Sequence, residues 1–160
     1  MMRHHVGVAT VNEHTGVPRL DTGARKRLAT ALERDGVVAG SLFGSQAVGE
    51  PGPLSDVDVA VWVEGALKPR ERGALRLELA DAAARALGTD QVDLVVLNDA
   101  PPLLRHRAVR DGEVLVERDR LAHVRLATTA LLEYLDTEPL RATLAAGRRR
   151  RLAEDRFGRR

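Results

Sequence analysis

Two aspartates at alternate positions, Asp56 and Asp58, open a run of apolar residues that extends to Val63. Successive side chains of a β-strand point to opposite faces, so this spacing places both carboxylates on one face and the intervening valines on the other. Two negative charges side by side repel each other unless a cation neutralises them, and carboxylate oxygens at this spacing suit Mg²⁺ bound together with nucleotide phosphates. We therefore predict that Asp56 and Asp58 are metal ligands.

A Gly-Ser pair, Gly44 and Ser45, precedes the first of these aspartates with ten residues between them. Glycine lets the backbone approach a ligand closely, and exposed N–H groups with a serine hydroxyl form a cradle for a triphosphate. The alternative pair Gly40-Ser41 is too far from the aspartates and is expected to belong to a strand over residues 37–43. The pattern argues against a P-loop, because that motif needs Gly-Lys followed by Ser or Thr and this stretch contains no lysine. Gly44 and Ser45 are thus the predicted nucleotide-binding residues.

A third aspartate, Asp93, lies within the valine-rich run 91–97, which has the character of a buried strand. A charge in such a run has no packing role, so it implies a partner. If this strand lies beside the Asp56 strand, the three carboxylates converge. A third carboxylate completes a two-metal site and accepts the proton of an attacking hydroxyl. Asp-x-Asp alone is a weak signal, but the full combination favours catalysis.

This combination resembles the DNA polymerase beta-like nucleotidyltransferases, and among them the minimal nucleotidyltransferases (MNT), the antitoxins of bacterial HEPN/MNT toxin–antitoxin modules. In that family a Gly-Ser turn, ten residues, Asp-x-Asp and a later aspartate form the active site. The matching positions here are Gly44, Ser45, Asp56, Asp58 and Asp93. The stretches 105–112 and 156–159 are also similar to the antitoxin branch, so the resemblance covers roughly residues 24–160.

The resemblance implies a specific reaction with ATP as the donor and two Mg²⁺ ions as cofactors. Asp56 and Asp58 would hold both ions, while Asp93 would ligate the catalytic ion and accept the hydroxyl proton. Gly44 and Ser45 would hold the β and γ phosphates. The implied acceptor is a tyrosine of a cognate HEPN toxin, an RNase that AMP transfer would neutralise. We therefore expect the toxin as a hetero-oligomeric partner.

Length and composition set the limits for this interpretation. At 160 residues the chain is expected to be one domain without a large acceptor-binding domain. No apolar run approaches the ~20 residues of a membrane span, and residues 1–5 are not followed by the hydrophobic region of a signal peptide. We expect a cytoplasmic protein that does not bind membranes. The absence of cysteine excludes disulfides and Cys-ligated zinc and agrees with a reducing compartment.

Positive charge is concentrated at the C-terminus. Residues 141–160 contain eight arginines and only Glu154 and Asp155 as acids, a net charge of +6, whereas the whole chain carries +2 and residues 1–140 therefore −4. A solvated helix face is the default for an arginine run. We favour contact with a protein partner over nucleic acid, because aromatic residues make up only 2% of the chain and form no stacking platform.

Periodicity and punctuation residues predict the order of elements. We expect helices over 21–36 (closed by Gly36), 69–88 and 103–110, strands over 37–43, from Asp56, around Asp93 and over 113–117, and a loop over 46–55. Two helices separated near Pro139 end the chain, the first lined by Leu121, Val124, Leu131, Leu132 and Leu135. This order predicts an α+β fold: a small mixed sheet with helices on one side, followed by a C-terminal helical hairpin. The resemblance names it a polymerase beta-like nucleotidyltransferase core.

The expected organisation is a flexible N-terminal arm (1–20), the nucleotidyltransferase core (21–118) and C-terminal helices with a basic tail (119–160). Two alternatives to the toxin-modifying enzyme stay open. One is a nucleotidyltransferase that modifies a small hydroxylated molecule, as aminoglycoside nucleotidyltransferases do; the lack of an acceptor domain argues against it. The other is an antitoxin that binds the toxin sterically without catalysis; the intact set of site residues argues against it.

Overall fold

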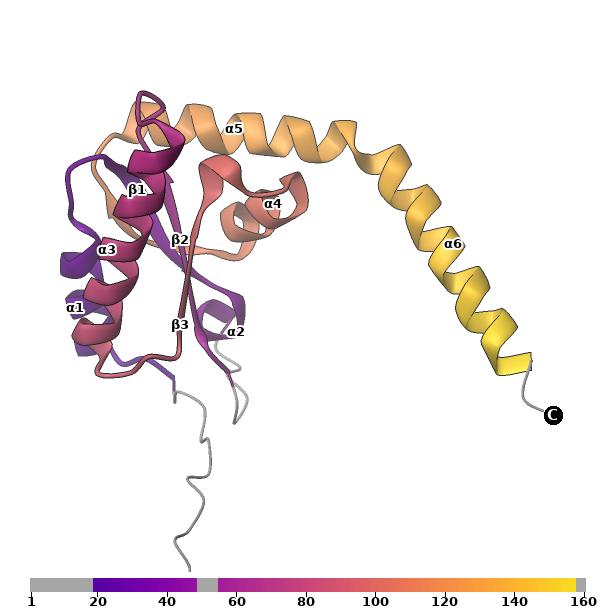
Figure 1. Cartoon of the computed structure of the whole chain (residues 1–160), viewed down its shortest axis with the longest axis horizontal. Helices are drawn as coiled ribbons and strands as arrows, with labels where there is room; N and C mark the ends of the chain where they lie inside the picture. Colours follow the sequence, from indigo (N-terminus) through magenta and orange to yellow (C-terminus); the bar gives the residue numbers. More distant parts are fainter. Residues whose placement is uncertain (1–18, 49–54, 158–160) are drawn as a thin grey trace, which may run out of the picture.

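The structure is a computed structural model that describes residues 19–48 and 55–157. Its centre is a four-stranded mixed sheet of β1 (Val37–Phe43), β2 (Val57–Val63), β3 (Val92–Val96) and β4 (Glu113–Glu117), in the order β3-β2-β1-β4. The helices are α1 (Thr22–Leu32), α2 (Gly44–Val48), α3 (Pro69–Leu87), α4 (Pro102–Asp111), α5 (Arg120–Asp136) and α6 (Glu138–Phe157), with a 3-10 turn η1 (Leu97–Asp99). The predicted α+β fold with a small mixed sheet is confirmed (Figure 1).

The sheet mixes both pairing directions. β1 pairs antiparallel with β2 and β4, whereas β2 pairs parallel with β3. A parallel pair needs a crossover connection, and α3 provides it between β2 and β3. Within β2 every residue except Asp58 is buried. This central strand is therefore held from both sides, and the residue that departs from its apolar pattern is a predicted site residue.

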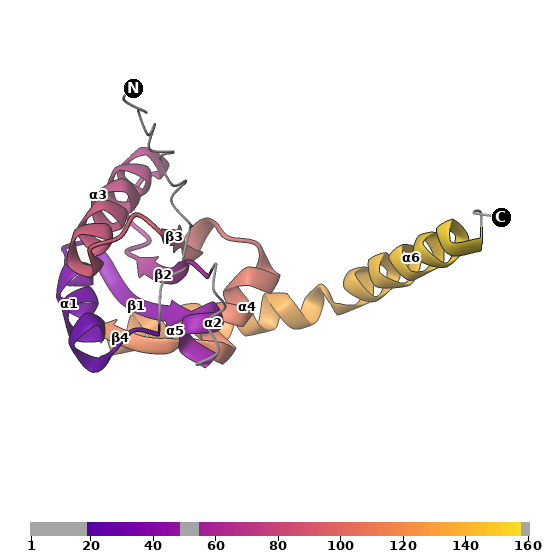
Figure 2. The ribbon, with the colours of Figure 1, turned by 90° about the horizontal axis from the view of Figure 1, so that it is seen from below.

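Helices cover both faces of the sheet, not one face as the sequence suggested. The odd-numbered valines of β2 pack with α1 and α3, while Ala60 and Trp62 pack with residues of α4 and α5. Figure 2 shows the sheet between these two groups of helices. The physical reason is that β2 is apolar on both sides beyond Asp58, so each face must be shielded from water.

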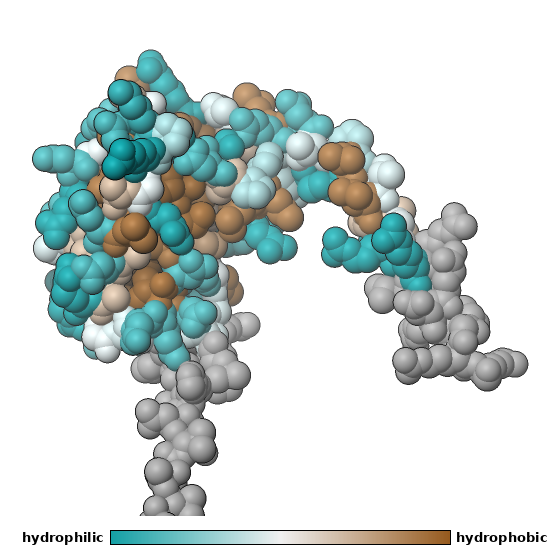
Figure 3. Space-filling view, viewed as in Figure 1, coloured by the Kyte–Doolittle hydropathy of each residue, from teal (hydrophilic) through white to brown (hydrophobic). Residues whose placement is uncertain are grey.

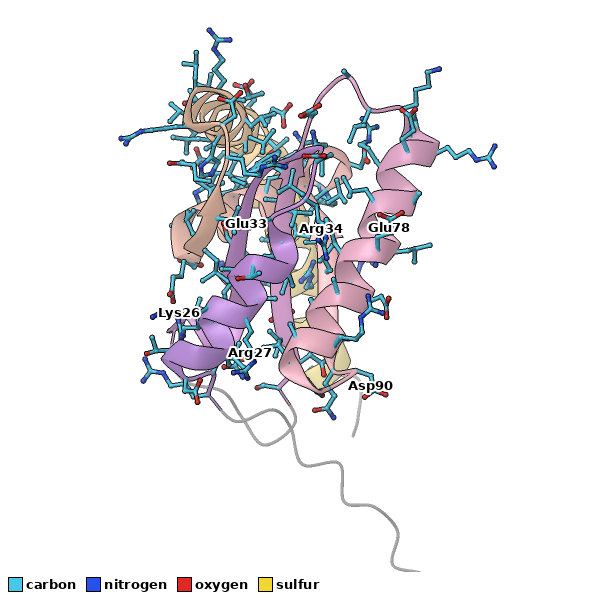
Figure 4. All side chains as sticks on the ribbon, turned by 90° about the vertical axis from the view of Figure 1, so that its left-hand side faces the viewer. Lys26, Arg27, Glu33, Arg34, Glu78 and Asp90 are labelled. Carbon is cyan, nitrogen blue, oxygen red and sulfur yellow. The ribbon has the colours of Figure 1, made fainter. Side chains whose placement is uncertain are left out.

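Helices α1 and α3 lie side by side as one layer (Figure 4). Asp21 caps α1 by accepting a 2.7 Å hydrogen bond from the Ala24 N–H. Helix α3 begins at Pro69 and ends at Leu87; the next residue, Gly88, has a φ of 70°, the left-handed conformation that closes a helix. Charged side chains such as Lys26, labelled in Figure 4, are exposed on the outer surface of the layer. The boundaries of α3 match the prediction because both punctuation residues act locally.

Helix α5 faces the core with small residues and exposes its large ones. Ala130 is fully buried, and Ala122 and Leu126 pack against the same cluster. The apolar side chains that the sequence placed along one face of this helix are instead exposed by 44–62%: Leu121, Val124, Leu131, Leu132 and Leu135. Periodicity identified the stripe, but it does not distinguish a core-facing stripe from one that faces outward.

Helix α6 projects from the body as a single arm (Figures 1 and 2). The expected hairpin with α5 is not formed: among the described side chains of α6 every one is exposed except that of Arg141. The Arg141 guanidinium lies 3.6 Å from the centroid of the Tyr134 ring, and Tyr134 stacks on His106 of α4 with ring centroids 3.8 Å apart. Because Tyr134 belongs to α5, these contacts attach the base of the arm to the end of α5 and to α4. Within the described residues no helix has the length and apolar character needed to cross a bilayer.

Two local predictions are corrected near the first strand. Helix α1 ends at Leu32, and Gly36, expected as its C-terminal cap, has a φ of 84° in the turn that leads to β1. The loop predicted over 46–55 begins later, because α2 extends to Val48; residues 49–54 lie outside the described part of the chain. Most of the predicted N-terminal arm also lies outside it, although Leu20 is buried.

Candidate active site

The sheet register brings two of the predicted carboxylates together. Asp58 of β2 is the direct partner of Asp93 of β3, because the parallel pairing aligns Val57 with Val92 and continues in step. In parallel strands that pair in register, matching residues point to the same face. The convergence predicted from the sequence is therefore present for this pair.

Asp93 is exposed, which corrects the expectation that it is a buried charge. β3 is one of the two edge strands of the described sheet and pairs with β2 alone. The apolar residues Leu94 and Val96 face the α1–α3 layer, while Asp93 lies on the other face, where Asp58 also lies. Its carboxylate is thus accessible to a second molecule, as an acceptor of protons from an external hydroxyl must be.

Asp56 lies just before β2 and is exposed. The pKa of Asp58 is raised, first by the burial of its carboxylate and then by the negative charges of Asp93 and Asp56. Asp56 and Asp93 are therefore both close enough to Asp58 to act on its charge. Among the described residues, however, no group of three or more His, Cys, Asp or Glu side chains is closed enough to form a metal cage. Mg²⁺ does not require one, because it keeps waters and phosphate oxygens and takes one or two carboxylates from the protein.

Gly44 begins α2 at the end of β1 and borders the Asp58 carboxylate. Its φ of 66° is in the left-handed region, and a Cβ at this position would overlap Asp58 Oδ2 and lie 3.0 Å from Cγ. Phe43, the residue before it, is the cross-strand partner of Asp58. The Gly-Ser turn and the carboxylates therefore form one continuous site, and glycine is needed because the carboxylate occupies the space of its side chain.

Gln46 anchors the short helix α2 to the body. Its side chain is fully buried, and its Oε1 accepts a 3.1 Å hydrogen bond from the Leu20 N–H. Arg25 of α1 donates to the Gln46 carbonyl at 3.4 Å and also forms an ion pair with Glu113 of β4. These contacts fix the backbone that presents Gly44 and Ser45. Sequence reasoning placed Gln46 in a loop and missed this role.

A pocket of about 530 Å³ opens beside these residues. One wall comes from the end of β1 and α2 with Asp58, and the other from α4, which contacts α2: Phe43, Gly44, Ser45, Val48 and Asp58 face Leu104, Arg107, Arg110 and Asp111. Figure 2 shows α2 beside α4. The volume is in the range of small-molecule sites. The competing pair Gly40-Ser41 lies inside β1, so it is structural.

Helix α4 contributes charged groups that sequence reasoning did not assign to the site. Arg110 donates two hydrogen bonds to Asp111, at 2.6 and 2.7 Å. These hydrogen bonds lower the pKa of Asp111 and raise the pKa of Arg110. For Asp111, burial acts against this lowering, whereas nearby positive charges, including that of Arg107, add to it. The available signal was the helical spacing of Leu104, Arg107 and Asp111, which marks one face of α4. That pattern does not indicate that this face of α4 meets α2.

Paired carboxylates beside a Gly-Ser turn, on a mixed sheet with a pocket for a small molecule, define a candidate nucleotidyl-transfer site. The family described as "Polymerase beta, Nucleotidyltransferase" matches residues 26–121, and the chain belongs to this family. Among curated protein sequences, none matches this chain.

Several solved structures share this fold. One, described as a toxin–antitoxin crystal structure with AMP-PNP, is 26% identical with a TM-score of 0.63, covering 77% of this chain and 96% of that one. Another, from Shewanella oneidensis, is described as a tri-AMPylated HEPN toxin in complex with MNT antitoxin; it is 25% identical with a TM-score of 0.59, covering 78% and 94%. A complex described as toxin–antitoxin MntA-HepT is 25% identical, with a TM-score of 0.58.

Proposed function

We propose that this nucleotidyltransferase is the antitoxin of a HEPN toxin and transfers AMP from ATP to a tyrosine of that toxin. The observation that carries the proposal is the contact of Gly44 with the Asp58 carboxylate, because it joins the phosphate cradle and the acidic cluster in one site. The description of a similar complex as an AMPylated HEPN toxin with an MNT antitoxin supports this choice of acceptor.

Each site residue has a role that its position suits. The backbone and hydroxyl of Gly44 and Ser45 would hold the terminal phosphates. The oxygens of Asp56, Asp58 and Asp93 would hold Mg²⁺, which when bound neutralises the developing charge on the phosphates. Burial first, and then the charges of Asp93 and Asp56, raise the pKa of Asp58; a bound cation would stabilise the charged carboxylate against both effects, so the residues present fit this ion.

The reaction follows from these positions. The tyrosine oxygen attacks the α-phosphorus of ATP, the bond from that phosphorus to the bridging oxygen of the β-phosphate breaks, and pyrophosphate leaves. Asp93, exposed on the edge strand, would take the tyrosine proton. The products are an AMP–tyrosine phosphodiester and pyrophosphate, which balances atoms and charge without a further reactant.

The exposed apolar side chains of α5 and α6 support a protein acceptor rather than a small one. Large apolar side chains are exposed along both helices, including Leu132 by 56% and Leu144 by 60%. Figure 3 shows a group of apolar side chains at the base of the arm, on the side that faces the body. A run of exposed apolar residues on one side of a protein marks a protein interface. The steric antitoxin shares this feature, so activity must separate the two.

The test uses the purified chain with the helical protein encoded beside it, if that protein carries an Arg-x4-6-His-x-Tyr motif. Incubation with ATP and magnesium chloride should leave AMP on a toxin tyrosine, detected by mass spectrometry. Asp56→Asn/Asp58→Asn should abolish transfer, whereas Asp81→Asn/Asp90→Asn, at two exposed aspartates of similar charge, should not. An unmodified toxin that is nevertheless neutralised would leave the steric antitoxin, and modification of a small hydroxylated molecule instead would favour the aminoglycoside-type alternative.

A further inference from the structure

The α4 wall of the pocket contains two arginines whose situations differ. Arg110 is held by Asp111 through two hydrogen bonds, so its charge is neutralised where it stands. Arg107, one turn earlier, also lines the pocket and is exposed. Within residues 19–48 and 55–157 no ion pair or side-chain hydrogen bond engages the Arg107 guanidinium, although its charge also acts on Asp111. It is therefore the cation of this wall that is available to a ligand.

The wall formed by Gly44 and Ser45 has no positive charge of its own with which to bind a triphosphate. Gly44 and Ser45 present neutral donors, and the nearest charge beside them is the Asp58 carboxylate. A triphosphate that enters this pocket brings negative charge next to a site that is already acidic. Backbone N–H groups and one hydroxyl do not offset such repulsion, whereas a guanidinium binds phosphate oxygens through two charge-assisted hydrogen bonds.

The position of Arg107 is set by the fold and not by the sequence near the aspartates. Ala108, the next residue, is 3% exposed and packs against the sheet, and Leu104, one turn before Arg107, packs against the same cluster. This fixes the rotation of α4, so that Arg107 faces the space in front of α2. A contact between α2 and α4 closes the distance between the two walls.

From these observations we propose that Arg107 binds the β and γ phosphates of the donor nucleotide from the side opposite Gly44 and Ser45. The inference rests on the proposed nucleotidyl transfer. On the departure of pyrophosphate the same contact would stabilise the charge that gathers on the leaving group. Arg107 is then a determinant of donor specificity: it favours a triphosphate over a monophosphate with the same base.

Calorimetric titration of the chain with ATP and with AMP, each with magnesium chloride, tests this inference. Arg107→Ala should weaken ATP binding at least ~10-fold, the loss of one charge-assisted contact, while AMP binding stays within about twofold. Arg107→Lys should recover part of the loss because it keeps the charge but not the paired hydrogen bonds. Arg85→Ala, which removes an exposed arginine of α3 outside the pocket, should bind both nucleotides as the wild type does.

Two results would overturn the assignment. Equal ATP affinity in Arg107→Ala and wild type would show that the guanidinium does not contact the phosphates. Equal losses for ATP and AMP would place its effect on the nucleoside, the α-phosphate or the fold, and thermal melting of the variant identifies the last. These titrations need no toxin. A wild type that binds ATP but modifies no toxin would reject the proposed acceptor while leaving the result for Arg107 intact.

Discussion

At the scale of single residues, Asp58 is where function opposes stability. It is the one residue of β2 that is not buried, and its surroundings combine partial burial with two like charges. A protein keeps such a group where its chemistry needs it, since an apolar or neutral residue would cost less. The strand accordingly has the composition of a core strand with one residue that is unfavourable for folding alone.

Asp58→Asn should therefore raise the melting temperature of the Mg²⁺-free chain at pH 7. The pKa of Asp58 is higher in the folded than in the unfolded chain, so the folded state binds the proton more tightly. Stability then falls as pH rises from the ordinary aspartate pKa through the raised one, and the charged form is destabilising above it. Calorimetric melts should show a gap between variant and wild type at pH 7 that closes toward pH 3.

The exposed aspartate Asp90, at the end of the α3–β3 connection, provides the control. Asp90→Asn should leave the melting temperature within about 1 °C of wild type, as exposed substitutions usually do. A wild type that is more stable than Asp58→Asn at neutral pH without metal would mean that the carboxylate makes favourable contacts that outweigh repulsion.

At the scale of elements, the five-residue helix α2 depends on tertiary contacts for its helical structure. Such a short segment has no helical stability of its own. The buried Gln46 side chain and the Arg25 contact to its carbonyl hold it against the body. Asn98 plays a similar part at the end of β2, where its amide exchanges two 2.9 Å hydrogen bonds with the Val63 backbone. In both places a polar side chain completes backbone pairing.

Gln46→Ala should destabilise the chain by roughly 1–3 kcal/mol, since it leaves the buried Leu20 N–H without its acceptor. For a chain of this size that is a loss of about 2–12 °C in melting temperature. ATP affinity should fall as well, because the turn that presents Ser45 loses its anchor. The control is the other glutamine of the chain, Gln91, which is half-buried. Gln91→Ala should change neither the melting temperature nor the ATP affinity appreciably. Unchanged melting of Gln46→Ala would refute the anchoring role.

Elements with local signals were predictable, and those that depend on distant contacts were not. Pro69 and Gly88 define α3 by their own backbone geometry, and the alternation around Asp58 defines β2. The site aspartates followed from their spacing, although their joint action on a ligand stays a prediction. The wall of the pocket formed by α4 could not be predicted in this way. The face of α4 that carries Arg107 becomes part of the site only because α4 packs beside α2. Helical periodicity gives a face but not its neighbour.

At the scale of the whole molecule, the chain has a packed body and an arm of about 30 Å, the length of a 20-residue helix. The arm has a glycine at its centre, Gly147, and arginines at 148–151. Glycine and neighbouring like charges weaken a helix that no tertiary contact supports. Under the proposed function, we expect its apolar residues to pack on the toxin, whose surface at that place should be apolar with an acidic border.

Leu140→Ser/Leu144→Ser should weaken toxin binding at least ~10-fold, because two side chains exposed by 61% and 60% would lose their burial in the complex. Melting temperature and ATP affinity should stay near wild type, since these residues touch neither the core nor the pocket. Surface plasmon resonance with immobilised toxin measures the change. The control is Leu77→Ser, an equally exposed leucine on α3 at 66%. Equal affinities for all three proteins would show that the arm does not bind the toxin.

The overlap between a side chain at position 44 and the Asp58 carboxylate also restricts the order in which this gene can accumulate substitutions. While Asp58 is present, almost any replacement of Gly44 strains the turn and displaces the carboxylate, so it costs stability and activity together. Once Asp58 has become a smaller residue, position 44 loses the steric part of that cost and keeps only the backbone part. Loss of catalysis in a descendant should therefore begin at position 58 and reach position 44 afterwards. A library that randomises both codons and selects for folded protein alone would recover bulky residues at 44 chiefly together with Gly, Ala or Ser at 58.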